Sequence, residues 1–144
     1  MAGEAINRGG WLTKRERSQA QADCARGAWV LAADLASETS AADVRATIRT
    51  RGTRGRGGDN LTTRARRIAC YLAMIVADCR AADVAAAAGM DPTTVRASVT
   101  WVEDARAVDP LLDGELEALE RRMILRAAHI CLRRLAYLDG EAAA

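Results

Sequence analysis

The segment 81–100 restricts what this chain can fold into more than any other part of the sequence. Val84 is an apolar anchor, Ala85 is small enough for two backbones to touch beside it, and Gly89 follows where a first helix must end. Glycine adopts a positive φ readily, and we expect a Cβ at this corner to clash. Two further apolar anchors follow the corner, Met90 and Val95. This spacing predicts a helix-turn-helix, in which two short helices cross at a steep angle.

The second helix of this motif has a clear start signal. Asp91 is a preferred N-cap residue, and Pro92 suits the first position of a helix. Thr93 and Thr94 then lie where a recognition helix presents short hydroxyl side chains to base edges and phosphates. The motif therefore predicts duplex DNA as the ligand, whereas the simpler interpretation is an ordinary pair of helices closed by a glycine cap. The candidate recognition residues are Asp91, Pro92, Thr93, Thr94, Arg96 and Ala97.

The composition favours an all-α fold. The chain has 144 residues, half of them apolar, and it is rich in alanine and lacks phenylalanine. Helices therefore approach one another closely through small side chains, with a few bulky residues as fillers. We expect one compact helical domain with a basic loop and a long C-terminal helix. The expected division is a flexible N-terminal arm at 1–12, an amphipathic helix and linker at 13–40, a helix-turn-helix domain at 41–110, and a C-terminal helix and tail at 111–144.

The charges are unevenly distributed, although the net charge of the chain is only +2. Residues 41–70 contain eight arginines and two acidic residues, whereas residues 91–120 contain eight acidic residues and two arginines. One part of the protein therefore attracts phosphate and the other repels it, which would orient the protein on DNA. The acidic part is left to face a protein partner, such as RNA polymerase or a co-regulator, or plain solvent.

An arginine and glycine run lies at 51–58. Closely spaced glycines make a helix too costly in backbone entropy, so we expect a flexible basic loop. Its arginines either contact nucleic acid or belong to a solvated linker. An RNA contact of the arginine and glycine type is a further alternative, but the run lacks the interleaved aromatic residues that stack on bases.

Two blocks of the sequence resemble the C-terminal duplex-binding domain of the bacterial replication initiator DnaA. That family reads A-R-Q-I-A-M-Y-L-A, then a helix and a turn, then G-G-R-D-H-T-T-V. The resemblance covers about residues 41–122. The matching blocks here are Arg64-Ala65-Arg66-Arg67-Ile68-Ala69-Cys70-Tyr71-Leu72-Ala73 and Gly89-Met90-Asp91-Pro92-Thr93-Thr94-Val95.

The resemblance implies how the basic residues are used. The loop occupies the place of the family's basic loop, so Arg54 and Arg56 are expected to enter the minor groove. The family's base-contacting histidine is replaced by Pro92, and its preceding basic residue is absent, so we expect a different target sequence. The remaining arginines expected on the phosphate backbone are Arg49, Arg51, Arg64, Arg66 and Arg67.

Further helices are predicted from apolar periodicity. We expect a helix from Thr13 to Ser37 that is broken at 37–40, a short helix at 41–50 capped by Ser40, and a helix at 62–78. After a break at Pro110 we expect a last helix at 113–139. The expected inward residues are Ala20, Cys24, Ala28, Leu31 and Leu35, then Ile68, Leu72, Ile75 and Cys79, and then Trp101 and Val102.

The last helix carries two apolar stripes. One consists of Leu112, Leu116, Leu119 and Met123, and the other of Ile124, Ala128, Cys131, Leu135 and Leu138. Either one stripe covers the domain and the other binds a partner, such as a second copy of the chain, or both are buried in one monomer.

Enzymatic activity finds little support in the sequence. The only lysine, Lys14, lies outside any nucleotide-binding loop, and the only histidine, His129, has no catalytic partner at suitable spacing. The four cysteines lack the spacing of a zinc site, so we expect reduced thiols and neither metal nor cofactor. The sequence shows neither a signal peptide nor a membrane span, which predicts a cytoplasmic, nucleoid-associated protein.

Together these features predict a sequence-specific DNA-binding protein without an ATPase, most naturally a transcription regulator. Regulators that activate gene-transfer-agent or prophage-like clusters carry a similar DnaA-like segment. Two alternatives stay open. One is a replication accessory factor that occupies initiator sites, and the other is a protein-interaction module with a relic of the motif.

Overall fold

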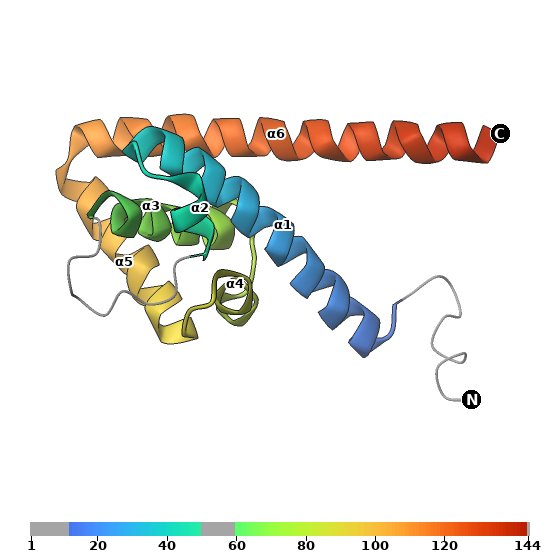
Figure 1. Cartoon of the computed structure of the whole chain (residues 1–144), viewed down its shortest axis with the longest axis horizontal. Helices are drawn as coiled ribbons and strands as arrows, with labels where there is room; N and C mark the ends of the chain where they lie inside the picture. The colour runs from blue at the N-terminus through green and yellow to red at the C-terminus, as the bar shows by residue number, and fades with distance from the viewer. Residues whose placement is uncertain (1–11, 50–59, 144) are drawn as a thin grey trace.

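Helices are the only regular elements in residues 12–49 and 60–143, the part of the chain that the computed structural model describes (Figure 1). The expected all-α class is therefore confirmed. The expected N-terminal arm lies almost entirely outside these residues. The elements are α1 (Lys14–Ser40), α2 (Val44–Arg49), α3 (Asn60–Tyr71), a π-helical turn η1 (Leu72–Val76), α4 (Ala81–Ala88), α5 (Pro92–Val108) and α6 (Pro110–Ala143).

Helix α1 is longer than expected. It begins with a capping box in which Thr13 and Glu16 satisfy each other's backbone N–H groups. The expected break at 37–40 is wrong, because the helix continues through Ser40. The Ser37 hydroxyl donates to the Ala33 carbonyl of the preceding turn at 2.6 Å, which leaves the helical backbone hydrogen bonds in place. It ends at Ala41, which has a φ of 55°.

The short helix after α1 begins later than expected. Ser40 belongs to α1 and does not cap α2. The Asp43 carboxylate instead accepts a hydrogen bond from the Ala46 backbone N–H at 2.8 Å. This interaction stabilises the first turn of a helix that runs from Val44 to Arg49.

The buried face of α1 is built around Trp29, whose side chain is 1% exposed. The indole N–H donates to the Ile48 carbonyl of α2 at 3.3 Å. The expected inward face is wrong at Ala20 and Cys24, which are exposed. Because α1 packs against α2, α3 and α4, residues 13–40 share one core with the following helices. The buried residues of this face are Ala25, Trp29, Ala32, Ala33, Leu35 and Ala36.

A π-helical turn replaces the last part of the expected helix at 62–78. The Ala77 backbone N–H bonds to the Leu72 carbonyl at 3.1 Å, five residues back. The wider turn changes the rotation per residue from Leu72 onward, so the apolar stripe loses its register within η1. Ile68 and Leu72 are buried as expected, whereas the expectation for Ile75 is wrong because its side chain is 49% exposed.

Pro110 both ends one helix and begins the next. Its ring stops α5 at Val108, and it then occupies the first position of α6, three residues before the expected start. The Asp109 carboxylate caps α6 by accepting the Leu111 backbone N–H at 3.0 Å. The first apolar stripe of α6 is buried as expected, at Leu112, Leu116, Leu119 and Met123.

A polar cluster fixes α5 to α3 and α6. The Tyr71 hydroxyl donates to the Glu120 carboxylate at 2.9 Å. The Arg106 guanidinium donates to the same carboxylate at 2.9 Å and to Asp113 at 2.7 Å. Because three helices meet at these side chains, the C-terminal end of α5 has a defined direction.

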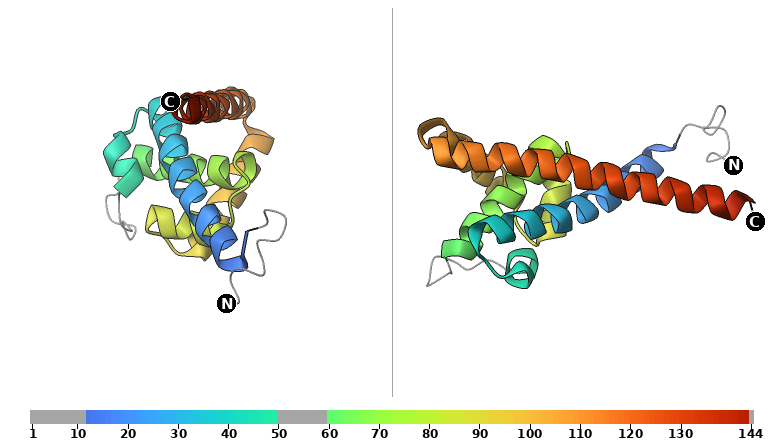
Figure 2. Two further views of the ribbon diagram at one scale, coloured as in Figure 1. Left: turned by 90° about the vertical axis from the view of Figure 1, so that its right-hand side faces the viewer. Right: turned by 90° about the horizontal axis from the view of Figure 1, so that it is seen from above.

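The C-terminal half of α6 extends beyond the rest of the protein (Figures 1 and 2). Before it does so, two ion pairs tie α6 to α1, joining Arg122 to Glu38 at 2.7 Å and Arg126 to Asp34 at 2.9 Å. Of the second apolar stripe, Ile124 is 58% exposed and Ala128 is exposed. Burial of both stripes in one monomer is therefore wrong for these two residues. The side chains of Cys131, Leu135 and Leu138 lie outside the described ones.

Candidate nucleic-acid interface

The predicted turn between α4 and α5 is confirmed. Gly89 has a φ of 68° and a ψ of 37°, and the next backbone N–H, from Met90, bonds to the Ala85 carbonyl at 2.9 Å. The Asp91 carboxylate accepts the Thr93 backbone N–H at 2.8 Å, and Pro92 is the first residue of α5. The expected clash is wrong, because a Cβ at Gly89 would meet no atom within 4 Å. Glycine is favoured here by its positive φ alone.

The N-terminal half of α5 has one buried and one exposed side. Val95 and Val99 are buried against the core, and the Ser98 hydroxyl donates to the Thr94 carbonyl at 2.9 Å. Pro92 is half-buried. The opposite side is open to solvent over the first two turns, so a duplex can reach it. The exposed candidate residues are Asp91, Thr93, Thr94, Arg96 and Ala97.

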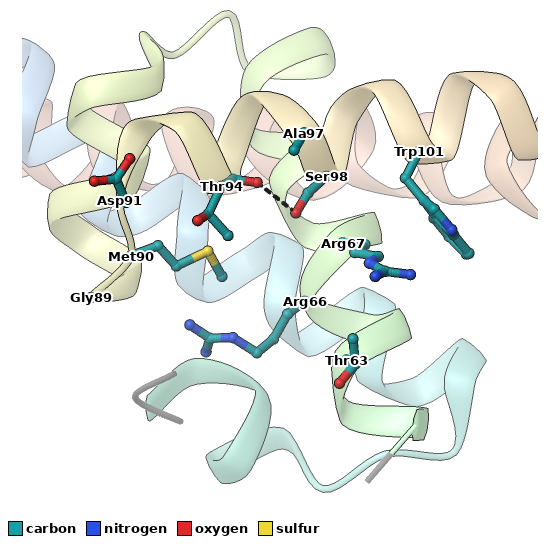
Figure 3. A pocket seen from close by; sticks show the side chains of 10 residues that line it. All are labelled: Thr63, Arg66, Arg67, Gly89, Met90, Asp91, Thr94, Ala97, Ser98 and Trp101. Atoms are coloured by element: carbon teal, nitrogen blue, oxygen red, sulfur yellow. Dashed lines mark hydrogen bonds between the residues drawn. The ribbon is translucent and has the colours of Figure 1, made fainter. Parts of the chain in front are cut away.

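A groove of about 570 Å³ runs between α3 and the N-terminal half of α5 (Figure 3). The close-up shows Thr63, Arg66 and Arg67 on α3 facing Thr94 and its neighbours on α5. The expected recognition residues and part of the expected basic set therefore border one space. The full lining is Thr63, Arg66, Arg67, Gly89, Met90, Asp91, Thr94, Ala97, Ser98 and Trp101.

Arg66 is a buried structural residue. Its side chain is 8% exposed and its guanidinium lies 5.4 Å from the centre of the Trp29 ring. It donates to the Thr47 carbonyl of α2 and, at 2.9 Å, to the Ala88 carbonyl at the end of α4. The expectation that Arg66 grips the DNA backbone is therefore corrected. Arg66 fixes α2 and the start of the turn against α3.

The other two arginines of α3 differ in their partners. Arg64 forms an ion pair with Glu115 of α6 at 3.1 Å, so its charge is opposed by a carboxylate. The Arg67 guanidinium lies 4.6 Å from the centre of the Trp101 ring. Trp101 was expected to point inward, but its side chain is 37% exposed at the edge of the groove. Val102 is buried as expected.

The remaining basic candidates are only partly described. Arg51, Arg54 and Arg56 lie outside the described residues, which stop at 49 and resume at 60. Arg49 is the last residue of α2, and its side chain is also outside the description.

Sequence reasoning found Thr94 and Ala97 but missed Ser98 and Trp101, which line the groove from the same side of α5. Thr94, Ala97, Ser98 and Trp101 follow the spacing of residues on one face of a helix, so periodicity measured from Thr94 would have found Trp101. Thr63 carried no such signal, because only the packing of α3 against α5 brings it into the groove.

The cysteine beneath the groove is a buried free thiol. Cys70 is buried, and its sulfur lies 3.8 Å from the Met90 sulfur. Burial raises the pKa of the Cys70 thiol from 9.0 to about 11. The thiol is therefore neutral at physiological pH and fills space as a small apolar group.

Residues 12–49 and 60–143 contain neither a group of three potential metal ligands nor a helix that is long and apolar enough to cross a membrane. Comparison with protein-family models, curated proteins and solved structures found no match for the chain. The resemblance to the DnaA domain therefore stays a prediction from the sequence.

Proposed function

We propose that this protein binds duplex DNA through the N-terminal end of α5 and acts as a sequence-specific transcription regulator. One observation carries the proposal. The exposed hydroxyl and guanidinium side chains of Thr93, Thr94 and Arg96 lie at the end of a helix that is held at a left-handed glycine turn. A fixed helix end with short polar side chains suits base edges in the major groove.

The charge distribution supports this orientation. Arg67 lies beside the groove, and the basic segment 41–70 precedes the motif in the chain. The acidic residues Glu103, Asp104 and Asp109 lie at the other end of α5. At 1.5 Å per residue, Thr93 lies about 15 Å or more along the axis of α5 from these carboxylates, so base edges beside the exposed end are more than a Debye length from them.

The proposal is tested by selecting bound fragments from a random duplex pool and measuring affinity for the selected site. Thr93→Ala and Thr94→Ala together should weaken binding by about 1 to 3 kcal/mol for each base that a threonine hydroxyl reads, or roughly five- to 150-fold. Thr39→Ala is the matched control, because Thr39 is exposed on α1 and does not line the groove. Equal affinities of the wild-type chain, the double threonine variant and the control would refute the recognition role of α5.

Binding measurements and the selected sites together distinguish the regulator from the two alternative functions. A chain that shows no salt-dependent binding to any duplex would be an interaction module with a relic motif. A chain that competes with the initiator on origin DNA would be a replication accessory factor. Selected sites upstream of a gene-transfer-agent or prophage-like cluster would support the regulator and identify its target. The acidic end of α5 would then face RNA polymerase or a co-regulator, which transcription assays with carboxylate variants would test.

The second apolar stripe of α6, in which Ile124 and Ala128 are exposed, is proposed to bind a second copy of the chain. Positions 124, 128, 131, 135 and 138 follow the alternating four- and three-residue steps of a coiled-coil seam. A parallel pair of such helices also places position 134, an arginine, beside position 139 of the other copy, an aspartate. Two copies would present two α5 helices to successive half-sites.

Sedimentation of the full chain tests this association. Ile124→Asp should give a monomer under conditions where the wild-type chain dimerises, because a carboxylate would enter the apolar seam. Val108→Asp is the control, since Val108 is 82% exposed and lies off the seam. A wild-type chain that stays monomeric at all concentrations, with and without DNA, would refute the dimer.

A further inference from the structure

The three arginines of α3 end up with different capacities to bind an anion. Arg64 is paired with the Glu115 carboxylate at 3.1 Å. Arg66 is 8% exposed and uses its N–H groups on the carbonyls of Thr47 and Ala88. Arg67 is half-buried, and among the described residues its guanidinium has neither a hydrogen-bond acceptor nor a carboxylate partner. Of these three side chains, Arg67 keeps both its charge and its five donors available.

Trp101 restrains Arg67 without neutralising it. The guanidinium lies 4.6 Å from the centre of the indole ring, within the range of a cation–π interaction. A carboxylate partner would cancel the positive charge that a phosphate needs, whereas an aromatic ring attracts the cation and leaves its N–H groups free. Figure 3 shows the two side chains together at one end of the groove, with Thr94 toward its other end.

The position of this pair suits the edge of a DNA groove. Trp101 follows Thr94 by seven residues on the same side of α5, which corresponds to about 10 Å along the helix axis. The major groove is about 8.5 Å deep. With the N-terminal end of α5 at the base edges, a group two turns behind it lies near the level of the phosphates.

We infer that Trp101 is a positioning residue that holds Arg67 against a backbone phosphate of the bound duplex. The inference rests on the proposed function. It adds a role in DNA binding for Trp101, which the sequence pattern had placed in the core. It also predicts that Trp101 affects binding only through Arg67.

A double-mutant cycle on the full chain tests this coupling, with affinity for a selected duplex measured at several salt concentrations. Arg67→Gln should reduce the slope of log affinity against log salt by about 0.9, the value for one neutralised phosphate. Trp101→Leu should weaken binding about two- to fivefold, the range of an exposed cation–π interaction. Trp101→Leu should have no further effect in the Arg67→Gln chain, and Trp101→Phe should retain wild-type affinity because it keeps an aromatic face. Thr39→Ala is the control for a change on an exposed helix surface outside the groove.

The outcomes separate this inference from the proposed function. Equal reductions in affinity from Trp101→Leu in the presence and absence of Arg67 would overturn the positioning role, because a merely structural tryptophan acts independently of the arginine. Failure of Trp101→Phe to restore affinity would overturn it as well. In either case, salt-dependent binding by the wild-type chain would leave the proposed function in place. A wild-type chain that binds no duplex would overturn both.

Discussion

Replacing Gly89 by alanine isolates the backbone strain of the helix-turn-helix corner. Gly89 has a φ of 68°, and a Cβ at this position would meet no atom within 4 Å. The substitution therefore introduces no packing clash. Its cost is the energy of placing an L-residue in the left-handed region, about 1 to 2 kcal/mol. We expect Gly89→Ala to lower the free energy of unfolding by this amount.

Gly27 provides a control with the opposite sign. It lies within α1, and a Cβ there would also meet no atom within 4 Å. Its φ is not in the left-handed range, so Gly27→Ala changes only helix propensity. This change should raise the free energy of unfolding by about 1 kcal/mol. Two glycines with equally open surroundings should therefore respond in opposite directions, because only one has a positive φ.

Equilibrium unfolding in urea, followed by far-UV circular dichroism, measures both effects. Gly89→Asn is a useful intermediate, since asparagine enters the left-handed region more easily than alanine does. We expect the stability order wild type, Gly89→Asn, Gly89→Ala. If Gly89→Ala stabilised the protein as Gly27→Ala does, position 89 would lack a left-handed backbone. The left-handed turn between α4 and α5 would then be refuted.

Two further predictions concern the residues beneath the groove. Arg66→Met should lower the free energy of unfolding by about 3 kcal/mol, because the carbonyls of Thr47 and Ala88 lose a charged donor. Arg64→Met, which removes an exposed ion pair, should cost less than about 1 kcal/mol in the same urea titration, and equal reductions would contradict the buried role of Arg66. Burial raises the pKa of Cys70 from 9.0 to about 11, so the folded state keeps a proton that the unfolded state loses. The free energy of unfolding should therefore fall by up to about 1.4 kcal/mol per pH unit between pH 9 and 11, and the fall should be shallower in Cys70→Ala. Identical pH profiles for the two chains would contradict the burial of the thiol.

The turn and its flanking helices could be predicted because their signals are local. A positive φ at Gly89, a capping carboxylate at Asp91 and a proline at the first helical position each depend on one or two backbone units. The first stripe of α6 was predictable for a related reason, since a regular helix keeps its period over many turns. The π-helical turn at η1 broke that period in the preceding segment, and the expectation for Ile75 failed there.

Local signals predicted some features around the candidate site and failed to predict others. The sequence placed Thr93 and Thr94 at the exposed end of a helix, because the cap and the buried Val95 fix which side faces out. It could not choose the buried face of α1, since an alanine-rich helix offers several nearly equivalent faces until the Trp29 ring meets its neighbours.

By itself, then, the sequence determined the turn at Gly89 and the first residue of α5, since a positive φ, a capping carboxylate and a proline act within a few adjacent residues. Only the tertiary structure decided what each arginine of α3 does. The carboxylate that pairs with Arg64 lies 51 residues away, and the carbonyls that hold Arg66 are 19 and 22 residues away. The ring beside Arg67 comes from α5. Whether each guanidinium is free or neutralised depends on the groups that folding brings next to it. The spacing of the arginines within α3 does not predict those groups.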